Sequence, residues 1–331
     1  MVTIHDVAKK SGVSLATVSR VINNSPVVSA STRQRVLDAI ESLGYQIPVR
    51  AGGNAKKQVL VVTDVSEAEI SNTLYQALSS YGYQMFVFYN CEQAAQSDLL
   101  RFLQQLPAGQ VAGMILHNFV RPVDAELKAA LDAYPIVQYG SQLPFSNTIC
   151  LDLNHFQAAY DATEILLQRG SRRIASFVHD ADTQSGLNMT KAPTNGYRSA
   201  LLDAGLSPDA ALLIESDFTI DGAYEQVRAF YAAGQKPDGF LCPLDTMALG
   251  VLRALRDMGV RVPQDVQVIS TMSFWCSPYS DPSISTLNYP AEALAQEAVR
   301  QLDLMISGQS GAGQFITLPH SFTLRESTRS L

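Results

Sequence analysis

The sequence contains little cysteine, and the cysteines form no pattern. Four of the 331 residues are cysteines, at Cys91, Cys150, Cys242 and Cys276, without CxxC or Cys/His ligand spacing. A disulfide framework or a zinc site would need such spacing. We therefore expect buried, unpaired thiols in a reducing compartment.

Long apolar runs are also missing. No run reaches the roughly 18 residues that indicate a membrane-spanning helix, and the first residues, MVTIHDVAKK, lack the apolar core of a signal peptide. We therefore expect a cytoplasmic chain with no membrane partner. Hydrophobic content of 47% and charged content of 17% are ordinary for a globular protein. The length favours two or three domains.

The common catalytic motifs are absent as well. The sequence has no G-x-S-x-G elbow, no G-x-G-x-x-G after a strand, no P-loop and no H-E-x-x-H. In the stretch VHDADT, the residues His179, Asp180 and Asp182 could suggest a metal, but a solvated polar loop is the simpler interpretation. We expect no enzyme, no cofactor and no catalytic or metal residues.

Positive charge is concentrated at the N-terminus. Residues 1–57 hold eight Lys or Arg against three acids, a net charge of +5, and the other 274 residues hold sixteen against twenty-eight, a net charge of -12. A basic segment on an acidic body suggests that only this segment meets a polyanion. A solvated basic face is the alternative.

The basic segment carries the pattern of three short helices. The first ends at SGV, where Gly12 permits a left-handed turn. Ser14 is a favoured N-cap for the second helix, as Ser29 or Ser31 is for the third. Two short helices joined by a Gly-containing turn are typical of a helix-turn-helix unit. The apolar stripe expected on the third helix consists of Val36, Leu37, Ile40 and Leu43.

The second helix, SLATVSRVIN, has a small and polar outer face opposite its apolar side. A recognition helix must enter a major groove about 12 Å wide, so a small outer face fits it. Arg20 stands among these small residues, and arginine pairs bidentately with guanine. An ordinary amphipathic helix with an exposed arginine is the alternative. The glycine turn, the third helix and the basic charge together favour DNA binding.

These residues resemble a known DNA-binding domain. The pieces DVA, GVS, ATVSRV, VS..TR.RV and GY stand in the order and spacing of the lactose/galactose repressor (LacI/GalR) family. The resemblance implies that Leu15, Ala16 and Arg20 read bases. It also implies that four polar residues position the helix against phosphates, namely Ser14, Thr17, Ser19 and Asn23.

A polar linker, QIPVRAGGNAKKQ, follows the third helix. In the family this segment folds on DNA as a hinge helix whose Leu wedges into the minor groove. Here it contains no Leu, and Gly52 and Gly53 each cost about 1 kcal/mol in a helix interior. Either only the cations Arg50, Lys56 and Lys57 touch phosphate, or the hinge folds without a wedge. We place the DNA-binding domain at 1–46, the hinge at 47–58 and the core at 59–331.

The rest of the chain alternates short apolar runs with helical stretches, for example VLVVTDV, QMFVFYN, VAGMILHN, RIASFVH and VQVIST. This alternation predicts parallel sheets covered by helices, in two doubly wound α/β lobes. Ligands of such sheets bind outside the carboxyl ends of the strands. An effector would therefore sit in the cleft between the lobes.

The resemblance extends to this core, through QRGSRRIASF, NGYRSALLDAGL, LDTMALGVLRALRDMG and LRESTR. It implies the periplasmic-binding-protein-like effector fold, with three crossovers near residues 158, 288 and 320. The first lobe would span 59–158 and 289–320, and the second 159–288 and 321–331. The family's tetramerising C-terminal heptads are missing, which implies a homodimer. We expect its surface on the helices around Leu74–Ala77 and Leu99–Leu103.

The expected pocket departs from the family. Pro193, Met272, Gly140 and Ser141 stand where the family has Arg, Asp and an Asp-Arg pair. The remaining effector-binding candidates are Phe218, Asp245, Tyr139, Glu69, Lys191 and Trp275. Core packing is the alternative for Phe218, an N-cap role for Asp245, and a capped loop for Trp275 with Tyr279.

The sequence therefore predicts a sequence-specific regulator of transcription. We expect a repressor of a carbohydrate or related metabolic operon that binds pseudo-palindromic operator DNA as a dimer. Its effector would be a sugar, a sugar phosphate or a similar small molecule. The alternatives are a regulator with an atypical or lost effector response, and a solute-binding protein or enzyme on the same core. A solute-binding receptor would need a signal peptide and would carry no helix-turn-helix unit, so the sequence disfavours it on both counts.

Overall fold

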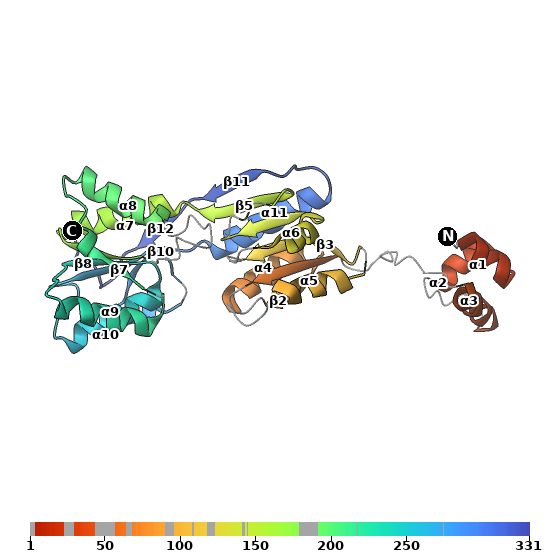
Figure 1. Ribbon diagram of the computed structural model, residues 1–331, viewed down its shortest axis with the longest axis horizontal. Helices are drawn as coiled ribbons and strands as arrows, with labels where there is room; N and C mark the ends of the chain where they lie inside the picture. The colour runs from red at the N-terminus through yellow and green to blue at the C-terminus, as the bar shows by residue number, and fades with distance from the viewer. Residues whose placement is uncertain are drawn as a thin grey trace.

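The computed structural model describes residues 4–22, 30–43, 57–63, 68–89, 96–107, 109–117, 123–140, 143, 145–178, 191–216, 218–273 and 275–331. These residues form a three-helix N-terminal unit and two α/β lobes (Figure 1). The prediction of a helix-turn-helix head with two doubly wound lobes is confirmed.

The N-terminal unit consists of α1 (Ile4–Ser11), α2 (Leu15–Ile22) and α3 (Ala30–Leu43). Two details of the expected third helix are wrong. Ser31 lies inside α3 and is not its cap, and Leu37 is 43% exposed while Ala39 is buried. The buried core of the unit is formed by Val7, Ala8, Val18, Val21, Val36 and Ala39.

The first lobe is built on a sheet of six parallel strands in the order β11-β5-β4-β3-β1-β2. The strands are β1 (Gln58–Thr63), β2 (Gln84–Tyr89), β3 (Val111–His117), β4 (Ile136–Tyr139), β5 (Thr148–Leu153) and β11 (Gln314–Leu318). The helices are α4 (Ala68–Ser80), α5 (Gln96–Gln105), α6 (Ala125–Asp132) and α11 (Ala291–Ile306).

Alternation along β1 explains how the centre of this sheet is covered on both faces. Val59 and Val61 pack with α4 and α11, while Leu60 and Val62 pack with α5 and α6. Side chains of successive strand residues point to opposite faces, so an unbroken apolar strand needs helices on both sides. The inner strands β1, β3, β4 and β5 are therefore covered on both faces, as their apolar runs predict, whereas the edge strands β2 and β11 are largely exposed.

The second lobe repeats this plan with the strand order β12-β10-β9-β8-β6-β7, in which only β12 runs antiparallel to its neighbour β10. The strands are β6 (Ile174–Val178), β7 (Leu213–Glu215), β8 (Gly239–Cys242), β9 (Gln267–Ser270), β10 (Ser285–Asn288) and β12 (Ser321–Thr323). The helices α7 (His155–Gln168) and α8 (Lys191–Asp203) cover one face, and α9 (Ile220–Ala232) and α10 (Asp245–Asp257) cover the other.

The four residues that mark the two helices of the expected dimer surface, Leu74, Ala77, Leu99 and Leu103, are themselves buried. Leu74 and Leu99 are 1% and 0% exposed, because both pack into the core of the first lobe, on opposite faces of its sheet. The expected contact on α4 and α5 therefore stays a prediction, which other side chains of these two helices would have to make. The large apolar side chains that are exposed in this region are Tyr75, Tyr81, Phe86, Val87 and Tyr89.

The thiols match the expectation only in part. Cys242 and Cys276 are buried and unpaired, but Cys150 is half-buried, and Cys91 lies outside the described residues. Burial raises the pKa of the Cys276 thiol to about 12, with a further contribution from the nearby Asp245 carboxylate. None of the helices in the described ranges has the length and apolar character that crossing a membrane requires.

Candidate functional site

The turn before α2 is fixed by local chemistry. Gly12 has a φ of 66°, and the amide of Val13 donates to the carbonyl of Ala8. The hydroxyl of Ser14 then accepts from the amide of Thr17 at 3.2 Å, as an N-cap does. The N-terminal turn of α2 therefore leaves the unit at a defined angle, which a helix that enters a DNA groove needs.

The predicted DNA contacts lie at this start of α2. Leu15 is 39% exposed although it is apolar, and the hydroxyls of Ser14 and Thr17 lie 2.9 Å apart near the surface. Ala16, Ser19 and Arg20 belong to α2, but their side chains, like the whole of Asn23, fall outside the described set. Their roles remain predictions.

Exposed cations lie on α1 and α3, the two helices that pack against α2. Lys9 and Lys10 occupy the last turn of α1 and are exposed, as is Arg35 on α3. In the linker, Lys57 is exposed, and Arg50 and Lys56 lie outside the described residues. Exposed lysine and arginine side chains supply the phosphate contacts on which DNA affinity mainly depends.

The carboxyl ends of three strands in the first lobe form a row of polar and aromatic side chains. Thr63, His117 and Tyr139 are register neighbours at the ends of β1, β3 and β4. The hydroxyl of Thr63 lies 3.0 Å from Nδ1 of His117, whose ring lies 4.8 Å from that of Tyr139. Tyr289, just before α11, stacks on Tyr139 at 6.4 Å.

This row is buried and uncharged. His117 is 2% exposed, and burial lowers its pKa to about 4, so its imidazole is neutral near pH 7. Tyr139, a predicted effector contact, is fully buried. His117 was not among the predicted site residues, although its position at the end of an apolar run was a usable signal, because ligands bind at strand carboxyl ends.

In the second lobe, Asp245 is the first residue of α10 and is fully buried. It is not an N-cap: Leu244 occupies that position, and no side chain caps the helix. Instead, the hydroxyl of Ser277 donates to Oδ2 of Asp245 at 2.9 Å. This bond joins the start of α10 to the segment that follows β9. The N-cap alternative for Asp245 is wrong, because Asp245 is the first residue inside the helix.

The other effector candidates are three residues of the second lobe and Glu69 of α4 in the first lobe. Phe218 has a φ of 60° and packs partly buried against the core between β8, α9 and α10, which favours the packing interpretation. Lys191 is exposed at the start of α8. Trp275 is 66% exposed beside Tyr279 at 83%. The side chain of Glu69 lies outside the described residues.

Comparison with known proteins identifies the chain. Residues 3–47 match the family of bacterial regulatory proteins of the lacI type, and residues 163–328 match the periplasmic binding protein-like domain. Catabolite control protein A of Priestia megaterium is 31% identical over 337 residues, covering 99% of both chains. The regulator CelR of Thermobifida fusca is 31% identical over 342 residues, covering 98% of both chains. The chain belongs to the LacI family.

Solved structures of LacI-family regulators have the same architecture. The complex of CelR with cellobiose superposes with a TM-score of 0.70 at 30% identity, covering 99% of this chain and 100% of that one. The Lac repressor dimer bound to operator and the anti-inducer ONPF gives a TM-score of 0.69 at 25% identity, covering 99% of both chains.

The structure places three of the four departures from the family pattern. Pro193 lies in the first turn of α8, Gly140 directly follows β4, and the carbonyl of Met272 accepts from the amide of Asp245. Ser141 lies outside the described residues. All three lie near strand or helix ends at the carboxyl edges of the sheets, where none of them offers a charge to a ligand.

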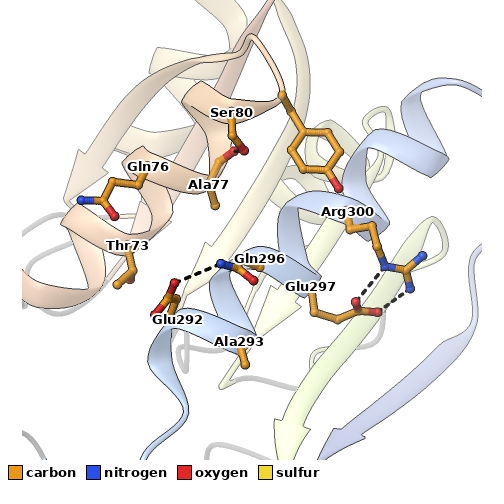
Figure 2. Close-up of a pocket in the computed structure, with 10 residues that line it drawn as sticks. Thr73, Gln76, Ala77, Ser80, Glu292, Ala293, Gln296, Glu297 and Arg300 are labelled. Atoms are coloured by element: carbon orange, nitrogen blue, oxygen red, sulfur yellow. Dashed lines mark hydrogen bonds and ion pairs between the residues drawn. The ribbon is translucent and has the colours of Figure 1, made fainter.

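A separate hollow of about 440 Å³ lies between α4 and α11 (Figure 2). Its charged side chains are already paired: Glu292 accepts from Gln296, and Glu297 accepts from Arg300 at 2.6 Å and 2.8 Å. It is lined by the sides of two helices and not by strand ends, so we do not assign the effector to it. Within the described ranges no group of three potential ligands could hold a metal; His179, Asp180 and Asp182 lie outside them.

Proposed function

We propose that this LacI-family protein is a sequence-specific DNA-binding repressor that a small molecule controls. The observation that carries the proposal is the capped, exposed start of α2 in a basic three-helix unit, joined to two effector-type lobes. Leu15, Ala16 and Arg20 read bases, and Ser14, Thr17, Ser19 and Asn23 position the helix on phosphates. Residues 1–46 bind DNA, 47–58 form the hinge with cations Arg50, Lys56 and Lys57, and 59–331 bind the effector and the second subunit.

The effector binds between the lobes, at the carboxyl ends of the strands. A relative crystallised with cellobiose supports a carbohydrate or related ligand. The first lobe offers neutral groups there, Thr63 and His117, while Lys191 at the start of α8 in the second lobe carries the positive charge that an anionic group such as a phosphate requires. Phe218, Asp245, Tyr139, Glu69 and Trp275 remain candidates for the rest of the contact.

The regulator acts as a dimer in the cytoplasm. A solved relative is a dimer on its operator, and two heads are needed to read two half-sites. We place the subunit contact on the exposed apolar side chains of α4 and β2, especially Tyr75, Val87 and Tyr89. Such a patch at a sheet edge is a template for a second copy.

Operator selection tests the proposal. Full-length protein is used to select duplexes from a random library, and binding is measured by mobility shift at several salt concentrations. We expect a pseudo-palindromic site and strongly salt-dependent affinity. Arg20→Ala should cost about 1–3 kcal/mol of binding and relax one base pair per half-site. Arg101→Ala, an exposed cation on α5, is the control; equal binding of selected and random DNA would refute the proposal.

Thermal shift with neutral sugars, sugar phosphates and nucleosides tests the effector class. Because the usual clamp positions hold Pro193, Met272 and Gly140, a free hexose has few partners for its hydroxyls, and each unpaired hydroxyl costs about 1–3 kcal/mol on burial. We therefore expect weak hexose binding. Micromolar affinity for a plain hexose that Asp245→Ala leaves unchanged would contradict these pocket positions.

A further inference from the structure

Three segments connect the two lobes, and the third runs from β11, the neighbour of β5, to β12, the neighbour of β10 (Figure 1). In the first lobe, β11 pairs with β5 up to the pair Leu318 and Leu153. In the second lobe, β12 pairs with β10 from the pair Ser321 and Asn288 onward. The chain therefore changes its partner strand within two residues, 319–320.

These two residues form a joint with few free torsions. Pro319 has its φ fixed by the ring. A change in the angle between the lobes at this segment must therefore fall on ψ of Pro319 and on φ and ψ of His320. Whatever holds His320 limits that change.

The side chain of His320 is held by the second lobe. It is 10% exposed, and its Nε2 lies 2.9 Å from Oδ2 of Asp161, two turns into α7. The ring of Phe322 lies edge-on at 5.8 Å. The other oxygen of Asp161 accepts from the side-chain amide of Gln157 at 2.7 Å, so both carboxylate oxygens are used.

Further hydrogen bonds connect this pair to the other two crossovers. The backbone amide of Gln157 donates to the side chain of Asn154, the N-cap of α7 in the first crossover. In the second crossover, Asn288 donates to Ser321 at 3.0 Å and accepts from Thr323 at 2.7 Å. A small apolar cluster packs at the three crossovers, formed by Leu153, Ala158, Leu287, Tyr289, Leu318 and Phe322.

A second histidine–aspartate pair lies nearby, but it joins residues that are close together in the sequence. Asp152 and His155 are 2.9 Å apart across the first crossover, three residues apart in sequence. By contrast, Asp161 and His320 are 159 residues apart and belong to α7 and the joint. Only the second of these two pairs fixes one crossover against the body of a lobe.

We propose that Asp161 and His320 are positioning residues that hold the 319–320 joint in one backbone conformation and so set how the lobes close on the effector. This inference rests on the proposed function, because closure matters only if it is transmitted to the DNA-binding unit. The side chain of His320 is largely shielded from solvent, at 10% exposure, and that of Asp161 is partly shielded, at 34%. A hydrogen bond to a charged group in such a place is stronger than a neutral surface bond.

Hydrogen exchange of the full chain, without DNA or ligand, tests the joint itself. The variants are Asp161→Asn, His320→Leu and their combination, with His320→Gln to restore a donor. We expect about tenfold faster exchange of the amides in 318–324 in each single variant, with no further increase in the double variant and partial recovery with glutamine. Tyr160→Phe is the matched control, because it removes a bond from α7 to Asp203 within one lobe.

Operator affinity distinguishes positioning from a merely structural bond. With the operator selected above, we expect the operator affinity of Asp161→Asn and His320→Leu to differ from that of wild type and of Tyr160→Phe by at least about threefold. The melting temperatures of these variants should stay close to that of the control. Wild-type exchange at 318–324 would overturn the inference, and so would faster exchange with unchanged operator affinity. If the wild type selects no operator, the proposed function fails, and the exchange result still decides whether the pair holds the joint.

Discussion

Gly196 of α8 lies against the carbonyl oxygen of Phe156 on α7, so closely that a Cβ atom at this glycine would be 2.0 Å from the oxygen. The obstacle is backbone, which cannot move as the end of a flexible side chain can. The two helices therefore pack at a distance that only glycine allows. Gly250 makes a similar approach, with the carbonyl of Ile220 2.2 Å from its hypothetical Cβ.

We predict that Gly196→Ala destabilises the second lobe by about 3 kcal/mol and lowers the melting temperature by roughly 5–10 °C. Thermal unfolding followed by circular dichroism measures the loss. Gly311→Ala is the control, because no atom lies within 4 Å of its hypothetical Cβ and its φ is not positive. Equal melting temperatures for the two variants would show that α7 and α8 separate at little cost.

Arg329 holds the C-terminal segment to the second lobe. Its guanidinium donates to the carbonyls of Pro263 at 3.0 Å, Gln264 at 3.2 Å and Arg169 at 3.3 Å, and its backbone amide donates to the side chain of Gln267. One planar group thus joins the end of α7 to the turn before β9. Arginine suits this place because its donors point in a fixed fork.

We predict that Arg329→Met lowers the free energy of unfolding by about 2 kcal/mol. Methionine donates no hydrogen bond, and water only partly replaces the lost donor at the backbone carbonyls. Chemical denaturation measures this loss. Arg253→Met, which removes an exposed pair with Asp257 on α10, should stay near wild type. A loss confined to Arg253→Met would contradict the assignment.

The sequence predicted the elements that local rules determine. Ser14 caps α2 as its hydroxyl predicts, and the unbroken apolar run of β1 became a strand covered on both faces. Leu37 was assigned to the core wrongly, because a helical spacing of three or four residues admits both Leu37 and Ala39, and only packing decides between them.

The site was less predictable because it joins residues that are distant in the chain. Thr63 and His117 meet only when β1 and β3 pair in one register. The bond between Asp161 and His320 needs the third crossover to return beside α7. Ser277 likewise reaches Asp245 only in the folded lobe. Periodicity within one segment carries no information about such contacts.

His117 should make stability depend on pH. In the unfolded chain a histidine takes up a proton near pH 6.5, whereas burial lowers the pKa of folded His117 to about 4. Between these two pKa values the unfolded state binds more protons than the folded state. The contribution of neutral His117 to the free energy of unfolding is therefore complete above pH 6.5 and is lost as the pH falls toward 4. The loss attributable to His117 should reach about 3 kcal/mol at pH 4.

Urea denaturation at pH 7.5, 6, 5 and 4 measures this dependence for wild type and for His117→Asn. Other groups titrate in both proteins, so the difference between the two curves isolates His117. We expect that difference to narrow as the pH falls, because the asparagine variant has nothing to protonate at this position. Parallel curves would mean that the imidazole is not buried as a neutral group.

The dimer contact gives the last prediction. Val87 and Tyr89 are 36% and 49% exposed on the edge strand β2, next to Tyr75 of α4 at 55%. An aspartate in the middle of an apolar subunit contact would be buried without a partner, which is costly. Val87→Asp with Tyr89→Asp should therefore convert a particle of twice the 36.0 kDa chain mass into monomers in light scattering at micromolar protein.

The opposite edge of the same sheet supplies the control for this variant. Phe315 of β11 is 53% exposed, so Phe315→Asp adds a charge at a comparable edge position. It should leave the dimer intact, and only the β2 variant should lose affinity for the two-half-site operator, since a monomer presents one head. If Phe315→Asp dissociates the particle and the β2 variant does not, the subunits meet along β11 and our assignment of the surface is wrong.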